Sequence, residues 1–266
     1  MSRPLPPSPL GSAALAARDL RFGLFHVAAN AVLLAMAYAW LWVPEARIWQ
    51  LTLSALLALA TAGLGLWLLA ATVWYFRARH RGEEARLRAA FSTTLARVPA
   101  LACWLAFFLF ALWMVSRLES AAEGWAGVTA SWLTMKRQEP VSPASVHTVY
   151  LWVIWALRWV VAPLMFLPVA ARVALHGFRA FRLSSVARAW RIFLRPPVLA
   201  VYVLLLMCGY FLPRLLTGWV PPASGLALEA ASMAARVGVA YLLVTASWLA
   251  LLSLLAGLAA EDEAPR

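Results

Sequence analysis

The sequence contains few acidic residues, few cysteines and almost no lysine. Only 11 of its 266 residues are Asp or Glu, against 23 Lys or Arg, and lysine occurs once. Cys103 and Cys208 both lie in apolar runs, where we interpret them as small buried hydrophobic residues. No CxxC, HExxH or Cys/His cluster with metal-ligand spacing occurs. The sequence therefore predicts no metal site and no cofactor.

Charged residues are scarce overall, and this scarcity excludes an ordinary water-soluble fold. The chain is 13% charged and 64% hydrophobic, whereas soluble domains average about 25% charged and about 45–50% apolar residues. A chain of this length has too little polar surface to cover so much apolar surface in water. The apolar runs also lack the alternation of a membrane β-barrel. We therefore predict an all-α integral membrane protein.

Six apolar runs are long enough to cross a bilayer, which needs about 20 helical residues for about 30 Å of hydrocarbon. None of the six contains Asp or Glu. They cover residues 22–43, 51–76, 98–116, 149–171, 197–216 and 237–260. We predict a single six-span bundle over residues 22–260. A cytoplasmic N-terminal segment of residues 1–21, disordered over its proline-rich first 12, precedes it, and a cytoplasmic tail of residues 261–266 follows.

The basic residues predict the orientation of these spans. Sixteen of them precede the first span, follow the sixth, or lie between the second and third or the fourth and fifth spans, and six lie on the other side. Because loops rich in Lys and Arg stay in the cytoplasm, both termini are predicted to be cytoplasmic. The preference for arginine over lysine, with many alanines, indicates a GC-rich bacterial genome and hence a bacterial inner (plasma) membrane.

The net charge of +12 predicts lipid rather than nucleic acid as the partner. The basic residues stand in short segments between apolar runs, where anionic head groups of the cytoplasmic leaflet can meet them. In segments 83–97 and 178–195, apolar residues share one helix face and arginines occupy the other. This pattern predicts amphipathic helices that lie in the cytoplasmic interface. Segments 118–135 and 226–236 are predicted to form short helices on the outer face.

Small residues predict which helices pack closely, because close backbone approach drives helix association in lipid. We expect the second and sixth spans to form the tight centre of the bundle. The stripes are Ala55, Ala58, Ala62, Gly65 and Thr72 in the second span, and Ala246, Ala250, Ser253 and Gly257 in the sixth. Separately, residues 95–101 resemble residues 193–199, with a spacing of 98. This similarity indicates either an internal duplication or two unrelated boundary signals.

Arg158 is the most informative residue within a span. It follows Val149 by nine residues, or about 14 Å of helix, and a mid-membrane arginine costs about 2.5–3.5 kcal/mol on insertion scales. No span offers an acid as its partner. Trp155 lies one turn earlier, and Glu229 and Arg236 are candidate neighbours. One interpretation is an anion or lipid contact formed by Arg158, Trp155 and Arg236; the other is an arginine that reaches outward to the head groups.

Two polar residues share a face of the first span. His26 and Asn30 are four positions apart, so they form either a polar site inside the bundle or hydrogen bonds to a neighbouring helix. Pro163 and Pro168 in the fourth span each remove a backbone hydrogen bond and predict a kink.

No catalytic residue is predicted, because GxSxG, P-loop and paired intramembrane acids are all missing. Residues 83–88 resemble the EExxxR motif of the abortive-infection membrane proteases, but no FxxxH or HxxxD/N motif follows in a span. The chain is therefore placed in no family. We expect a non-enzymatic scaffold or envelope accessory protein. The alternative is a transporter or permease-like component for an anionic or amphipathic solute.

Overall fold

A computed structural model describes residues 8–44, 46–220 and 225–263 of the chain. Within these ranges the chain is almost entirely helical and contains no strand. Six helical stretches are long and apolar enough to cross a membrane. The prediction of an all-α membrane protein with six apolar helices is therefore confirmed.

The described elements follow one another with short connections. The first half contains α1 (Pro9–Ala14), η1 (Leu15–Arg18), α2 (Leu20–Leu41), α3 (Ile48–His80), α4 (Leu87–Thr94), η2 (Leu95–Arg97) and α5 (Val98–Arg137). The second half contains α6 (Pro143–Ala156), η3 (Leu157–Val161), α7 (Ala162–His176), η4 (Gly177–Phe181), α8 (Leu183–Phe193), α9 (Pro196–Leu206), η5 (Met207–Phe211), α10 (Leu212–Gly218) and α11 (Leu226–Glu263). The segments η3 and η5 are π-helical turns inside longer helices.

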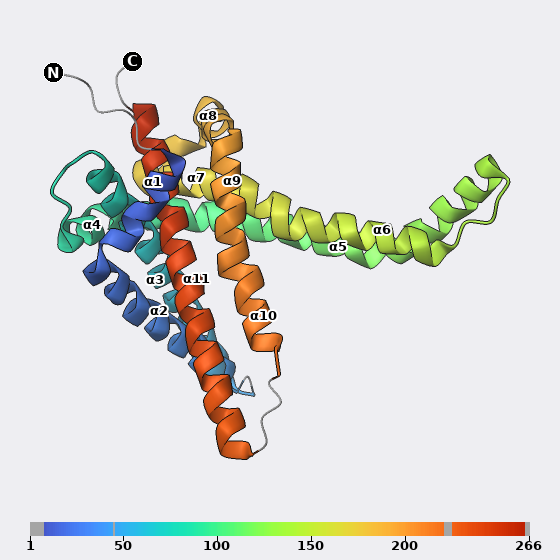
Figure 1. Cartoon of the computed structure of the whole chain (residues 1–266), viewed down its shortest axis with the longest axis horizontal. Helices are drawn as coiled ribbons and strands as arrows, with labels where there is room; N and C mark the ends of the chain where they lie inside the picture. The colour runs from blue at the N-terminus through green and yellow to red at the C-terminus, as the bar shows by residue number, and fades with distance from the viewer. Residues whose placement is uncertain (1–7, 45, 221–224, 264–266) are drawn as a thin grey trace.

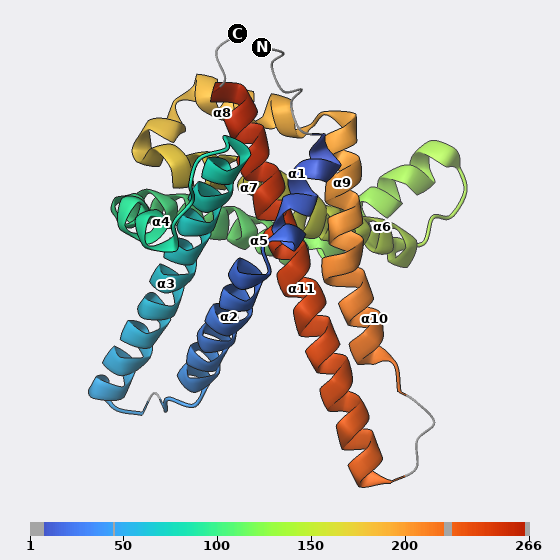
Figure 2. The same ribbon diagram turned by 60° about the vertical axis from the view of Figure 1, so that its left-hand side comes forward.

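The long helices form two groups that run in different directions (Figure 1). Helices α2, α3, α9–α10 and α11 run side by side at one end of the molecule and diverge toward the other (Figure 2). Helix α5 and the continuous helix α6–η3–α7 form a hairpin that leaves this group sideways. The six apolar helices are thus present as predicted, but the third and fourth form an arm beside the other four.

The hydrophobic core lies at the end where α1, α8 and the last turn of α11 meet. It includes large buried side chains from six helices: Val73 and Phe76 of α3, Leu101 of α5, Val169 and Val173 of α7, Phe193 of α8, Val198 of α9, and Leu252 and Leu254 of α11. Helix α11 contacts α1, α2, α3, α7, α8, α9 and α10. Helix α11 therefore lies at the centre of the core end, in contact with all seven of these helices.

The predicted contact between the second and sixth spans is confirmed as α3 against α11, but its position is different. Ala62 and Ala246 are exposed, so the outer halves of the two stripes do not form the tight centre. The close contact is at Gly257, where a Cβ atom would lie 2.8 Å from Ser12 Oγ and 3.2 Å from His80 Nε2. Ser253 Oγ donates a hydrogen bond of 2.6 Å to the Ser12 carbonyl oxygen.

Helix α1 explains why the small residues are needed at this end. The sequence predicted disorder over residues 1–12, but residues 9–18 form α1 and η1, which pack on α11. Ser8 caps α1, since its hydroxyl accepts a hydrogen bond of 3.1 Å from the Gly11 N–H. The prediction for residues 8–12 was wrong because a capped turn with a buried face is stable against a helix; residues 1–7 lie outside the described residues.

Helices α5 and α11 are longer than the sequence predicted. The expected separate outer helices, 118–135 and 226–236, are continuous with the spans beside them. At 40 residues, α5 measures about 60 Å, twice the hydrocarbon thickness. It ends at Gln138, whose φ of 56° is left-handed. No proline stands between residues 100 and 139, so nothing in the backbone stops the helix earlier.

The connections at the core end carry the two predicted amphipathic helices, α4 and α8. Helix α8 buries Ala189, Ile192 and Phe193 and exposes its arginines. Arg97 and Arg195 each precede a helix, α5 or α9, that has proline in its first turn. A proline there costs little, because its missing N–H would have no partner in a first turn.

Candidate functional site

Two π-helical turns, η3 and η5, have the same cause in the sequence. Each ends two residues before a proline: η3 before Pro163 and η5 before Pro213. In η3 the Ala162 N–H donates to the Leu157 carbonyl oxygen, five residues back. Proline has no N–H, and its ring clashes with the carbonyl oxygen four residues earlier, so a wider turn relieves the clash. Such turns occur frequently at functional sites.

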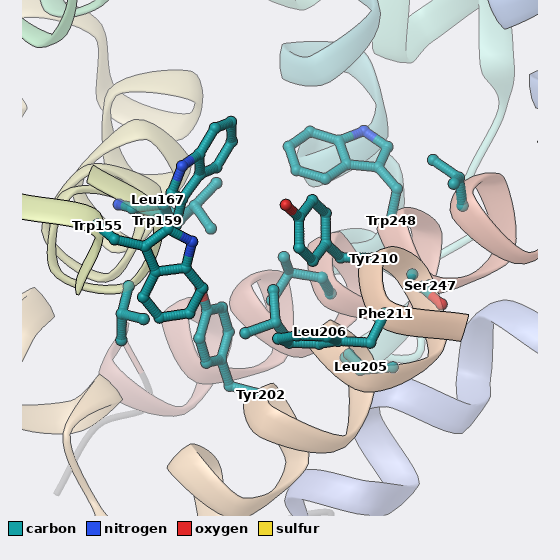
Figure 3. A pocket seen from close by; sticks show the side chains of 15 residues that line it. Trp155, Trp159, Leu167, Tyr202, Leu205, Leu206, Tyr210, Phe211, Ser247 and Trp248 are labelled. Carbon is teal, nitrogen blue, oxygen red and sulfur yellow. The ribbon is translucent and has the colours of Figure 1, made fainter. Parts of the chain in front are cut away.

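A pocket of about 280 Å³ lies between the two π-helical turns (Figure 3). It has three walls, from the base of the hairpin, from α9–η5 and from α11. The residues that line it are Trp155, Trp159, Val160, Pro163 and Leu167; Tyr202, Leu205, Leu206, Gly209, Tyr210 and Phe211; and Val244, Ser247, Trp248 and Leu251. The pocket is partly open to the surroundings, and almost all of its wall is apolar.

Aromatic rings form much of the pocket wall. Trp159 of η3 and Tyr210 of η5 stack with ring centroids 5.9 Å apart and an interplanar angle of 25°. Trp155 lies in edge contact with Trp152, at 6.0 Å between centroids. Figure 3 shows Trp155 and Trp159 on one side of the pocket, with Tyr210 and Trp248 on the other. Aromatic rings from α6, η3, η5 and α11 therefore line the cavity.

Gly209 lets η5 approach α11 closely beside the pocket. A Cβ atom at this position would lie 2.7 Å from Ser247 Cβ and 3.2 Å from Ser247 Oγ. Any larger residue would push the two helices apart. The width of the pocket on this side is therefore set by one glycine.

Polar groups at the pocket are few. Ser247, Tyr202 and Tyr210 contribute hydroxyl groups to the lining. Arg214, one turn beyond Tyr210, donates a hydrogen bond of 3.2 Å from Nη1 to the Tyr210 hydroxyl oxygen. An apolar ligand chain with a polar or anionic end would find its polar contact at Tyr210 and Arg214.

Arg158 has an acidic partner, contrary to the sequence prediction. Its Nη2 donates to Glu119 Oε2 at 2.6 Å and to Ser116 Oγ at 3.2 Å. The prediction was wrong because α5 continues past residue 116 and carries Glu119 alongside η3. Glu229, the expected neighbour, is not the acid that Arg158 contacts. Arg158 is 27% exposed at its side chain and does not line the pocket.

Trp155 lies in the pocket wall, away from the ion pair of Arg158. Among the described residues, cation–π contacts join Arg117 to Trp113 and Lys136 to Trp132. No cation–π contact between Arg158 and Trp155 is among them. The sequence identified both residues, but the structure gives them separate roles.

Arg236 caps the end of α10. Its Nη1 donates to the carbonyl oxygens of Leu216, at 3.4 Å, and Trp219, and its Nε donates to the Ser232 carbonyl oxygen at 3.2 Å. A cation at a helix C-terminus satisfies carbonyl groups that have no helical partner. The structure thus places Arg236 in contact with backbone carbonyls, and its contacts do not include Arg158.

His26 pairs with a neighbouring helix, one of the two outcomes that the sequence left open. Its Nε2 lies 2.9 Å from Thr72 Oγ1 of α3, and the Thr72 hydroxyl donates to the Leu68 carbonyl oxygen at 2.6 Å. A hydroxyl has one hydrogen, so the His26 ring donates to Thr72. Asn30, one turn later, is half-buried.

A cluster of ion pairs at the last turn of α11 was not predicted. Three consecutive acids there contact basic residues from α3, α7, α8 and the start of α9. The pairs are Glu261 with Arg195; Asp262 with Arg172 and Arg188; and Glu263 with Arg77, Arg81 and His176. A signal was present, since these acids follow the last span and share a side with twelve loop arginines.

The described residues contain no group of three His, Cys, Asp or Glu side chains placed to hold a metal ion. The acids of the EExxxR string lie in the connection between α3 and α4. Glu84 pairs with Arg86 at 3.0 Å, and Glu83 lies 4.0 Å from Arg81. These acids are therefore engaged with nearby arginines of the same connection.

Comparison of the chain with known protein families, with curated proteins and with solved structures gives no match. The function is therefore inferred from the geometry.

Proposed function

We propose that this chain is a non-enzymatic bacterial inner-membrane protein that binds the apolar part of a lipid-like, amphipathic molecule. The observation that carries the proposal is the apolar pocket between η3 and η5. Its wall is built by three separate segments of the chain, at residues 155–167, 202–211 and 244–251. Sites for small molecules are concave, mostly apolar and supplied with a few polar groups, and this pocket has those properties.

The composition of the pocket selects the class of ligand. An ion or sugar would lose its hydration without replacement here, since the polar lining consists of a few hydroxyl groups. A saturated or prenyl chain has no polar group whose hydration would be lost, and it gains contact with aromatic rings. Arg214 at Tyr210 provides one cationic contact for a polar end. The combination favours an amphipathic molecule with a single hydrocarbon chain in the pocket.

The orientation forms part of the same proposal. The basic connections at α4 and α8 contact anionic head groups of the cytoplasmic leaflet, and both termini are cytoplasmic. In the structure α8 lies at the same end as the last turn of α11 (Figure 2). The acids of that turn pair with Arg81 of the first basic connection and with Arg188 and Arg195 of the second, which supports a common side for the two. The segments enter the interface as amphipathic helices.

A second candidate is a permease-like component for the same kind of amphipathic solute. It is favoured by the two π-helical turns, because each interrupts the regular hydrogen bonding of a long helix at the pocket. A helix can bend where its hydrogen-bond ladder is interrupted. In this candidate the pocket releases its ligand when η3 and η5 move apart.

Photo-labelling with a diazirine-bearing fatty acid tests the ligand class. We expect the label in the purified chain to saturate and to attach to peptides from α9–η5 and α11. Leu205→Trp adds a large ring at the pocket wall and is expected to remove most of this labelling. Leu204→Trp on the same helix is the control, because Leu204 is 51% exposed and does not line the pocket.

The two variants distinguish labelling in the pocket from labelling through general contact with lipid. Equal labelling of all apolar helices in the parent chain would contradict a specific site. So would a loss in Leu204→Trp as large as the loss in Leu205→Trp. Transport of the labelled acid into vesicles would select the permease-like candidate over simple binding.

A further inference from the structure

A second pocket lies where the end of α7 meets η4, α8 and the start of α5. It has a volume of about 380 Å³ and is lined by Arg97, Leu175, His176, Arg179 and Ser185. It shares no residue with the apolar pocket. The residues that line it therefore provide evidence that is independent of the apolar pocket.

A glycine turn brings these residues together. Gly177 has φ 59° and ψ −140°, a conformation that residues with a Cβ atom rarely adopt. It ends α7 and redirects the chain into η4, so that His176 and Arg179 line the same pocket. A Cβ atom on Gly177 would also lie 3.9 Å from Arg97 Cγ. The pocket is thus built on a backbone conformation specific to glycine.

The pocket lining is cationic and contains no acid. Arg97 is half-buried and fixed in place, because its Nη1 donates to the Ala174 carbonyl oxygen at 2.9 Å. Within the described ranges, neither Arg97 nor Arg179 forms an ion pair with a carboxylate. Two guanidinium groups therefore face one space without a neutralising partner there.

The acid that approaches this pocket is already engaged. Glu263 Oε1 lies 3.0 Å from His176 Nε2, while Glu263 Oε2 accepts from Arg77 and Arg81. Glu263 therefore holds His176 at the inner edge of the pocket. Its negative charge is shared among these three basic groups in direct contact and also acts on Arg97 at longer range. Among the described residues, no carboxylate lies within ion-pair distance of Arg179.

Phosphate oxygens match this set of groups. Guanidinium groups bind phosphate through paired N–H donors, and a serine hydroxyl adds a neutral donor. Ser185 Oγ lies 3.5 Å from Nη1 of Arg172, whose charge is already paired with Asp262. The site also lies beside amphipathic α8, at the level where phospholipid head groups are expected.

We propose that Arg97, Arg179, His176 and Ser185 form a binding site for a phosphate group, supplied either by a lipid head group of the cytoplasmic leaflet or by a soluble phosphate compound. The arginines supply charge and paired donors, Ser185 supplies a hydroxyl donor, and His176, whose Nε2 is held by Glu263, borders the site. The proposal does not depend on the function of the apolar pocket.

Calorimetric titration of the full chain in maltoside detergent tests the site at constant pH. The probes are dihexanoyl phosphatidic acid, dihexanoylglycerol as the matched lipid without phosphate, and inorganic phosphate. We expect phosphatidic acid to bind and dihexanoylglycerol to give no binding at this site. Arg97→Gln and Arg179→Gln are each expected to weaken binding by about tenfold, the effect of one lost charged hydrogen bond.

Arg88→Gln is the matched control, because Arg88 is an exposed arginine of α4 outside the pocket. It is expected to change the affinity by less than about twofold. The variant Arg97→Gln loses the hydrogen bond to Ala174 and could fail to fold for that reason. Arg179 is exposed, so the variant Arg179→Gln then decides the result. Binding of inorganic phosphate identifies a soluble ligand as sufficient, and binding of phosphatidic acid alone identifies a head group.

Two results would overturn the proposal. One is the failure of both phosphate-bearing probes to bind the parent chain. The other is a loss of affinity in Arg88→Gln equal to that in Arg179→Gln, which would show a diffuse effect of surface charge. Neither result depends on labelling of the apolar pocket, so the two proposals can fail separately.

Discussion

At the scale of single residues, the His26–Thr72 contact shows how a polar pair is held inside apolar surroundings. His26 is 1% exposed and Thr72 is 1% exposed, and edge-on contact with Phe22, at 4.7 Å between centroids, covers the imidazole ring. The threonine hydroxyl accepts from His26 and donates within its own helix. His26 Nδ1 has no protein partner, so the contact with Thr72 is the ring's one hydrogen bond in the described chain.

Thr72→Val tests the importance of this contact. It keeps the shape of the side chain but leaves His26 Nε2 buried without an acceptor, which costs about 1–3 kcal/mol. We expect a lower free energy of unfolding in detergent titrated with dodecyl sulfate. Thr61→Val is the control, because within the described residues the Thr61 hydroxyl bonds the Leu57 carbonyl oxygen of its own helix and no neighbouring helix. Equal stability of the two variants would show that the pair contributes nothing.

At the scale of elements, the last turn of α11 fastens the helices at the core end. Its three acids contact side chains that belong to α3, α7, α8 and the residue before α9. The pairs differ in exposure. The Arg172 and Asp262 side chains are 11% and 8% exposed, whereas the Arg195 and Glu261 side chains are 48% and 39% exposed. Exposed pairs contribute little, while breaking a buried pair leaves an uncompensated charge.

Asp262→Asn and Glu261→Gln compare these two situations on one turn of helix. Asp262→Asn is expected to lower the free energy of unfolding by about 3 kcal/mol, because Arg172 stays buried without a counter-charge. Glu261→Gln is expected to lower it by about 1 kcal/mol or less. Both are measured by the same dodecyl sulfate titration. A similar loss in the two variants would show that burial of the pair does not determine its contribution.

At the scale of the whole molecule, the distribution of charge predicts which ends face the cytoplasm. The segments between α3 and α5 and between α7 and α9 contain nine of the 22 arginines. The turn between α5 and α6 carries Lys136 and Arg137 at its start. Figure 1 shows this turn at the free end of the sideways hairpin, away from the core end.

Labelling of intact cells with a membrane-impermeant maleimide tests the orientation. In a background of Cys103→Ser and Cys208→Ser, the variant Arg182→Cys is expected to stay unlabelled until the membrane is opened. Lys136→Cys is expected to react in intact cells, because its turn is predicted to lie outside. Labelling of the first variant with protection of the second would reverse the orientation.

The features that depend on the hydropathy of a short stretch of the chain were predictable from the sequence. The apolar environment, the all-helical class, the six apolar helices and the amphipathic α4 and α8 follow from hydropathy and period over about 20 residues. Pro163 predicted a disturbed helix, and the structure shows a π-helical turn just before it, whereas Pro168 lies inside the α-helix α7. These properties need no knowledge of a distant segment.

The features that depend on which helix faces meet were decided only in three dimensions. Helices in lipid are apolar on every side, so no periodic pattern marks the face that contacts a neighbour. Trp155 and Arg158 were recognised in the sequence, but their separation into a pocket wall and an ion pair with Glu119 depends on the uninterrupted course of α5. The contacts of Glu263 with Arg77 and His176 likewise join residues far apart in the chain. The sequence determined the apolar surroundings of the chain and the positions of its helices, and tertiary packing determined which residues form the pockets and ion pairs.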